Sequence, residues 1–191
     1  MATLTVANIV KRLQNVFPGL PGRALYELFT TTRTDLVAVE ARATALETYT
    51  AVAATAATLA VTAASHHGRT IYLNKADGIA ATLPAATGSG AVFTFVVAVT
   101  ASGGNYVIKV ADATDEFIGR LIAPDTDAAT AQNHWVPADN DDTITLNGTA
   151  TGGKIGDIIV CTDVASNVYH VWGIIGQSGG SEATPFSNTV S

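Results

Sequence analysis

The sequence predicts an α+β protein in which an N-terminal helical region is followed by an antiparallel β-sandwich or barrel. Neither glycine nor proline occurs from Arg23 to Ala64, where alanine, leucine, glutamate and threonine dominate, and this favours one long helix. After residue 65 short β-rich runs alternate with turn residues, which is typical of an antiparallel β-fold. Four segments follow: a docking arm (1–22), a long helix (23–64), a β-domain (65–178) and a flexible tail (179–191).

Composition limits the classes of partner. The 191 residues are 48% hydrophobic and 14% charged, which is enough apolar material for a sizeable core. Ten Lys and Arg face 16 Asp and Glu, so the net charge of -6 argues against nucleic acid and against an anionic membrane as partners. The single cysteine excludes an intramolecular disulfide and a thiolate zinc site. We therefore expect neither a metal nor a cofactor.

The first segment predicts a short amphipathic helix. Ile9, Leu13 and Phe17 fall at helical spacings, and two prolines and two glycines within residues 17–22 end the helix. Residues 1–34 carry a net charge of +3, so the remaining 157 residues carry -9. This charge difference predicts that the arm docks on a partner through Ile9, Leu13 and Phe17.

The second segment fits a seven-residue repeat. Its larger apolar seam positions are Leu25, Phe29, Leu36, Val39 and Leu46. Two interpretations stay open: the seam joins copies of the chain in a coiled coil, or it packs on the chain's own β-domain. The first is favoured because one small domain could hardly cover so long a helix with so few charges. Threonines at 30–32 and 34 weaken the helix prediction.

The third segment contains at least seven candidate strands. Turn signals separate them, among them Asp77-Gly78, Gly103-Gly104 and Asn147-Gly148. The expected strands are Thr70–Leu73, Ala91–Val99, Tyr106–Val110, Phe117–Ile122, Thr143–Leu146, Asp157–Cys161 and Val168–Ile175.

Two clusters could hold a cation. Residues 139–142 (Asp-Asn-Asp-Asp) offer four oxygen-bearing side chains, but their spacing departs from a calcium-binding EF-hand loop, so a solvated acidic turn is favoured. His66 and His67 are adjacent, so one chain cannot clamp a metal with both, although copies around a symmetry axis could converge on an ion. We favour a helix end capped by Gly68 for this pair.

Catalytic motifs are absent from the sequence. No Gly-x-Ser-x-Gly elbow occurs, and Gly152-Gly153-Lys154 lacks the spacing of a phosphate-binding loop. Cys161 follows Ile-Ile-Val and is most simply a small buried hydrophobe. The sequence therefore predicts a protein that is not an enzyme.

Several motifs between residues 69 and 176 resemble those of small virion proteins of tailed bacteriophages. They are a strand followed by Thr-Leu-Pro-Ala (82–85), the run Phe-Thr-Phe-Val-Val (93–97), and a closing pair of strands built on Gly156-Asp157 and on residues 169–173. The resemblance implies a β-domain with a structural role in the virion. This sequence departs from the best known capsid cement fold because it adds a long N-terminal helical region.

The resemblance implies two functions. The first is a capsid decoration (cement) protein that binds the major capsid protein on the outer surface of the phage head and stabilises it, as a homo-oligomer that we take to be a trimer. The alternative is a short head or tail fibre whose β-domain binds a host receptor such as a surface glycan. Its candidate contact residues are Tyr106, Trp135, Tyr169 and Trp172, although for Trp135 and Trp172 a place in the core is the favoured interpretation.

Overall fold

The described part of the chain is mostly β-sheet. We analysed a computed structural model, which describes Lys11, Asn15, Glu27, Thr30, Thr31 and residues 34–37, 51–127 and 132–190. The chain divides into two compact units, Met1–Tyr49 and Thr50–Ser191. The second unit, which we call the β-unit, contains all the strands of the described residues.

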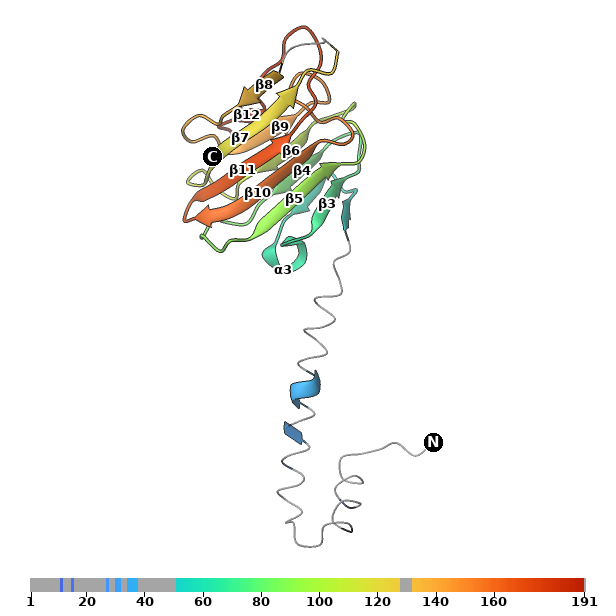
Figure 1. Cartoon of the computed structure of the whole chain (residues 1–191), viewed down its shortest axis with the longest axis vertical. Helices are drawn as coiled ribbons and strands as arrows, with labels where there is room; N and C mark the ends of the chain where they lie inside the picture. Colours follow the sequence, from blue (N-terminus) through green and yellow to red (C-terminus); the bar gives the residue numbers. More distant parts are fainter. Residues whose placement is uncertain are drawn as a thin grey trace. The chain divides into compact units, whose positions relative to one another are not determined.

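The β-unit consists of two sheets (Figure 1). The seven-stranded sheet has the order β1 (Val52–Ala54), β3 (Thr70–Leu73), β5 (Val92–Val97), β10 (Ile158–Ala165), β11 (Val168–Ile174), β7 (Glu116–Pro124) and β8 (Gln132–Trp135). The five-stranded sheet has the order β12 (Phe186–Ser187), β9 (Thr143–Leu146), β6 (Tyr106–Lys109), β4 (Ile79–Thr82) and β2 (Thr58–Ala60). One short helix, α3 (Ala63–His66), joins β2 to β3.

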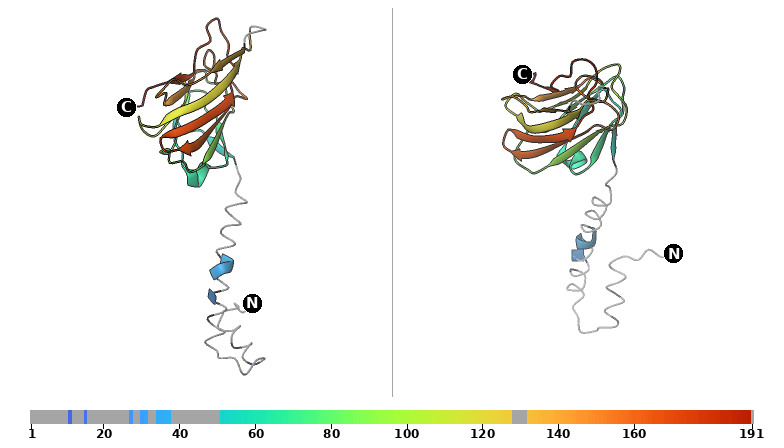
Figure 2. Two further views of the ribbon diagram at one scale, coloured as in Figure 1. Left: turned by 60° about the vertical axis from the view of Figure 1, so that its left-hand side comes forward. Right: turned by 45° about the horizontal axis from the view of Figure 1, so that its top comes forward.

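The core lies between the two sheets, which face one another in both views of Figure 2. Alternation along each strand turns one set of side chains inward, as in β5, where Phe93 and Phe95 are buried. Tyr169 stacks obliquely on Phe93 and on Phe117, with ring centroids 6.5 and 6.4 Å away. This aromatic cluster joins β5, β11 and β7 of the larger sheet across β10, which lies between β5 and β11.

The α+β prediction is wrong. β-structure makes up 44% of the described residues, and no coiled coil is seen among the few residues described before position 51. The predicted helix over 23–64 includes two strands, β1 and β2. The run from Ala51 to Ala64 has five β-branched residues, a type that favours strands, and two of them, Val52 and Thr58, pair in β1 and β2.

The predicted antiparallel pairing is also wrong, because both sheets are mixed. The pairs β1–β3, β3–β5, β2–β4, β4–β6 and β7–β11 are parallel. From β1 to β7 each strand is followed by a strand of the other sheet, so successive strands of one sheet run in the same direction. A short turn in the sequence therefore marks a crossing between layers here and not a hairpin.

All seven expected strands occur, and the ends of most of them differ from the expected ends by a few residues. The segment 179–191 contains β12, which pairs with β9, so part of the expected tail belongs to the sandwich. Among the described residues no helix has the length and apolar character to span a bilayer.

Candidate functional site: the outer face of the seven-stranded sheet

The outer face of the seven-stranded sheet exposes large apolar side chains. Alternation turns every second residue of each strand away from the core. On β11 these are Val168, His170, Trp172 and Ile174, and on β7 they include Ile118 and Ile122. Trp172 is 51% exposed and Ile174 is 52% exposed.

The strand register aligns these residues into a continuous row. Ile158 pairs with Val96 on one neighbouring strand and with Ile174 on the other, and Ile174 pairs in turn with Ile122. The row continues to Tyr72 on β3, and on the other side to His134 on β8. Directly paired side chains in a sheet lie about 5 Å apart, so the row forms one apolar strip across six strands.

A second row runs beside the first and differs in relief. It contains Thr94, Val160, Trp172 and Arg120, in that order across β5, β10, β11 and β7. Val160 is 7% exposed and therefore sits low in the face, whereas its neighbour Trp172 protrudes. One half of this row thus carries large side chains and the other half carries small ones.

The outer face carries few charges. On the outward positions of the strands β3, β5, β10, β11 and β7, Glu116 and Arg120 are the only residues of the Asp, Glu, Lys and Arg types. Glu116 accepts a hydrogen bond from the backbone N–H of Asn140. Arg120 has no ion pair with any residue in the described ranges. Few charges, an exposed Trp and an Arg are typical of the centre of a protein–protein interface.

Asp163 fixes one end of the central strand β10. Its buried carboxylate accepts hydrogen bonds from the backbone N–H groups of Thr87, Gly88 and Ser89 and from both neighbouring hydroxyls. Gly88 has φ 75°, which lets the turn present these donors together. Burial alone would raise the pKa of Asp163, but the hydrogen bonds outweigh it and lower that pKa to about 2.

Asp157 fixes the other end of β10. Its carboxylate accepts from the backbone N–H groups of Gly153, Lys154 and Gly176 at 2.7 to 3.0 Å. Burial raises the pKa of this carboxyl, although these hydrogen bonds oppose the shift. The two aspartates connect loops that are distant in sequence, so they stiffen the strand at the centre of the outer face.

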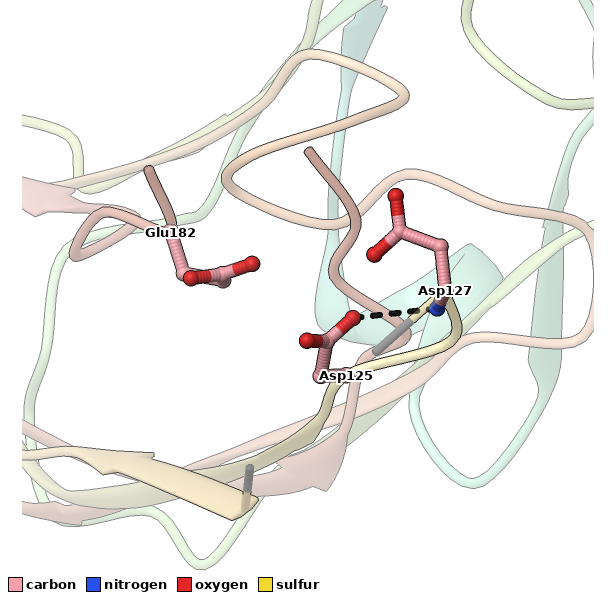
Figure 3. A group of neighbouring side chains, drawn as sticks. All are labelled: Asp125, Asp127 and Glu182. Atoms are coloured by element: carbon pink, nitrogen blue, oxygen red, sulfur yellow. Dashed lines mark hydrogen bonds between the residues drawn. The ribbon is translucent and has the colours of Figure 1, made fainter. Parts of the chain in front are cut away.

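A group of three carboxylates lies at the far end of β7 (Figure 3). Asp125, Asp127 and Glu182 place one oxygen each within 4.8 Å of the others. The Asp127 N–H donates to Asp125, and the Gly179 N–H donates to Asp127. Calcium takes six to eight oxygens, so three carboxylates would supply only part of its shell. The hydrogen bonds show what the group does in this structure: it links the end of β7 to the C-terminal segment.

The residues predicted for docking and for the coiled-coil seam mostly lie outside the described residues. These are Ile9, Leu13 and Phe17 of the arm, and Leu25, Phe29, Val39 and Leu46 of the seam. Leu36 is described and is 57% exposed. The structure therefore brings none of the predicted residues together in a described site.

The predicted glycan contacts separate into buried and exposed residues. Tyr106 and Tyr169 are both 0% exposed and donate their hydroxyls to backbone carbonyls inside the sandwich. Trp135 is half-buried, and its indole N–H donates to the Gln177 side chain. Trp172 alone of the four faces outward on the sheet.

The other candidate residues have structural positions. Asp142, from the acidic run 139–142, is buried and accepts from the backbone N–H groups of Thr189 and Val190. His66 accepts from the Thr62 N–H at the start of α3, and His67 accepts from the Val92 N–H. Cys161 is fully buried, and burial raises the pKa of its thiol far above the ordinary value. This cysteine is the small core residue that the sequence predicted.

Sequence reasoning missed the outer face, although a signal was present. Strands β7, β10 and β11 carry Ile, Val or Trp at outward positions as well as inward ones. A strand that is apolar on both sides needs cover on both sides.

Comparison with family models, with curated proteins and with solved structures found no match for this chain.

Proposed function

We propose that this chain is a structural protein of a tailed-bacteriophage particle, namely a capsid decoration protein that binds the outside of the head and stabilises it. The observation that supports an adhesive role is the outer face, with Trp172 and Arg120 at its centre and isoleucines around them. Soluble proteins seldom expose an apolar patch of this kind unless another surface covers it. The phage setting rests on the motif resemblance.

The motifs behind the resemblance have defined roles in the fold. The Gly-Asp motif supplies Asp157, which joins three backbone segments at the start of β10. The Pro of Thr-Leu-Pro-Ala is Pro84, whose carbonyl accepts from the Tyr169 hydroxyl. These residues hold the sandwich together, so the resemblance concerns the scaffold that carries the outer face.

Capsid stabilisation by this protein works through several simultaneous contacts. The arm residues Ile9, Leu13 and Phe17 dock on the major capsid protein, and copies of the chain are held together through their β-units. Linked contacts bind far more tightly than each contact alone, because the second binding step becomes intramolecular. The β-unit, with five basic and 12 acidic residues, has a net charge of -7, whereas residues 1–34 are basic.

The fibre alternative has less support. A glycan-binding face needs exposed aromatic side chains, and of the four candidate aromatics Tyr106 and Tyr169 lie in the core and Trp135 is half-buried. No described feature favours a receptor-binding role over an adhesive contact with protein.

Reconstitution on particles tests the proposal. Heads that lack this protein would be mixed with the full chain, with Trp172→Asp, and with Val107→Asp as a matched control. Val107 is a partly exposed residue on the outer side of the five-stranded sheet. We expect the full chain and Val107→Asp to pellet with the heads and to raise the temperature at which the heads rupture. Recovery of Trp172→Asp should fall at least tenfold.

A chain that starts at Ala24 tests the arm in the same assay, and its recovery should also fall. Failure of the full chain to pellet with the heads, or an unchanged rupture temperature, would contradict the decoration function. Equal recovery of Trp172→Asp and Val107→Asp would show that the outer face is not needed for binding to the heads.

A further inference from the structure

The outer face has a relief that can fit a second copy of itself. The row Thr94, Val160, Trp172 and Arg120 carries small side chains on β5 and β10 and large ones on β11 and β7. Consider a line that separates the large residues of a surface from the small ones. A half-turn about that line places the large residues of one copy over the small residues of the other, so the surface is complementary to itself. The line here runs along the strands, between β10 and β11.

We propose that the outer face is an interface between two copies of this chain, related by a two-fold axis that runs between β10 and β11. This axis places Trp172 of each copy over Val160 of the other, and Arg120 over Thr94. Sheets that pack face to face keep their strands within about 30° of each other, and this arrangement satisfies that preference.

The neighbouring apolar row fits the same axis. Ile174 of one copy meets Ile158 of the other, and Ile122 meets Val96, so branched aliphatic side chains cover one another across the whole strip. At the two ends of the row Tyr72 meets His134, which are polar-tipped residues at the rim of the contact. An apolar centre with a polar rim is the usual anatomy of a stable interface.

The charges do not oppose this arrangement. Arg120 lies one and a half strand spacings from the axis, so the two copies of Arg120 are three spacings apart, or about 14 Å. For guanidinium groups that reach solvent at the rim, that separation exceeds the Debye length of about 8 Å at physiological salt, so their repulsion is largely screened. The Arg120 stem can lie over Thr94 while its guanidinium reaches solvent or a backbone carbonyl of the other copy.

The size of the face suits a dimer. From β3 to β8 the face spans five strand spacings, about 24 Å, and with side-chain margins about 29 Å. A third row, beside that of Trp172, contains Val92, Thr162, His170 and Ile118. Three rows along the strands add about 20 Å, which gives a flat area of about 600 Å² before side-chain relief is counted. A standard interface buries about 800 Å² on each partner, so one copy can cover the face.

The scarcity of charge favours a second copy over a transient partner. Contacts that form and dissociate are about as polar as ordinary protein surface, whereas homodimer interfaces are more apolar. The outer face belongs to the second type, because Glu116 and Arg120 are the only Asp, Glu, Lys or Arg residues on the outward positions of its five central strands. The dimer is a property of the isolated protein, so its test is independent of the proposed role on the phage head.

Sedimentation equilibrium of the full chain at micromolar concentration tests the dimer. We expect a mass of twice 19.6 kDa for the wild type and for the control Val107→Asp. Trp172→Asp should weaken the dimer at least a hundredfold and sediment as one chain. Trp172 is half exposed, so an unchanged circular dichroism spectrum and melt will show that the variant folds. A wild-type mass of one chain, or a Trp172→Asp variant with the wild-type mass, would overturn the proposal.

Chemical cross-linking tests the position of the axis. Thr94→Cys and Arg120→Cys would be mixed and treated with a short bis-maleimide, while the native Cys161 stays unreactive because it is buried. The axis predicts a covalent dimer in the mixture and little in either variant alone, since each residue is about 14 Å from its own copy. Equal cross-linking in the mixture and in the single variants would exclude this axis.

Discussion

Single buried carboxylates hold the turns of the β-unit in place. Asp163 gathers five donors from residues 87–89, Asp157 gathers three backbone N–H groups, and Asp142 gathers two near the C-terminus. Hydrogen bonds to an ionised group are stronger than neutral ones, and leaving buried donors unmatched is costly. These aspartates therefore act as internal clamps where long loops meet β10 and β9.

Replacing Asp163 by asparagine should destabilise the β-unit. The amide group would turn N–H donors toward the donors of residues 87–89, so we expect the free energy of unfolding to fall by about 3 kcal/mol. Urea denaturation followed by circular dichroism measures this change. Asp139→Asn, at an exposed position, is the matched control and should keep the wild-type midpoint. Equal midpoints for the two variants would show that Asp163 does not clamp the turn.

Asp163 should also contribute to acid sensitivity. Its pKa is about 2 in the folded chain against an ordinary 3.8, so the fold favours the ionised form. This contribution to stability is complete above about pH 4 and is lost as the pH falls through about 2, which amounts to about 2 kcal/mol. Burial raises the pKa of Asp115 and Asp157. The contributions of these two carboxyls to stability therefore grow, and do not shrink, as the pH falls.

The difference between the wild type and Asp163→Asn isolates this one residue. Urea denaturation at a series of pH values should show the stability gap between the two proteins closing between pH 4 and pH 2. A gap that stays constant over that interval would mean that the carboxylate is not ionised preferentially in the fold.

Among the elements, the strand β12 extends the sandwich into the C-terminal segment. Phe186 is 5% exposed and belongs to the core, and the Thr145 N–H donates to the Pro185 carbonyl. The sequence suggested a flexible tail here because glycine and serine dominate residues 176–181. The two apolar residues Phe186 and Val190, which pack on the core, are too sparse to form a periodic pattern.

Truncating Phe186 should therefore cost stability. Phe186→Ala leaves a cavity in the core and should lower the free energy of unfolding by about 3 kcal/mol, as measured by thermal or urea denaturation. Ser181→Ala, at an exposed position in the same segment, should leave it unchanged. If the two variants melt alike, β12 is not part of the cooperative unit.

The sequence located most strands and missed how they connect. Alternating patterns with turn residues marked seven strands, from Thr70–Leu73 to β11, because their inward residues are large and regular. Helix propensity gave the wrong answer for β1 and β2, because alanine favours helix while pairing with β3 and β4 decides the outcome. Parallel pairing depends on crossings between layers, which no local pattern records. The outward apolar residues of β7, β10 and β11 indicated that these strands are covered on both sides, but only the register shows that the residues share one surface.

At the scale of the whole molecule, the β-unit combines a stiff scaffold with one apolar face left uncovered. The clamps at Asp157 and Asp163 fix β10, and the register then aligns Trp172 with Val160 and Arg120 on the outer face. A rigid face loses little conformational entropy on association, which favours a tight and specific contact. The structure thus links buried polar groups to an adhesive surface.

Hydroxyl-radical footprinting of the full chain over a dilution series measures directly whether the outer face is covered in solution. We expect Trp172 to be protected at high concentration and to react faster as dilution separates the copies, whereas Ile155, which is 71% exposed in a loop outside the sheet, should react at a constant rate. A Trp172 reactivity that is high and unchanged at every concentration would contradict a role of the outer face in association.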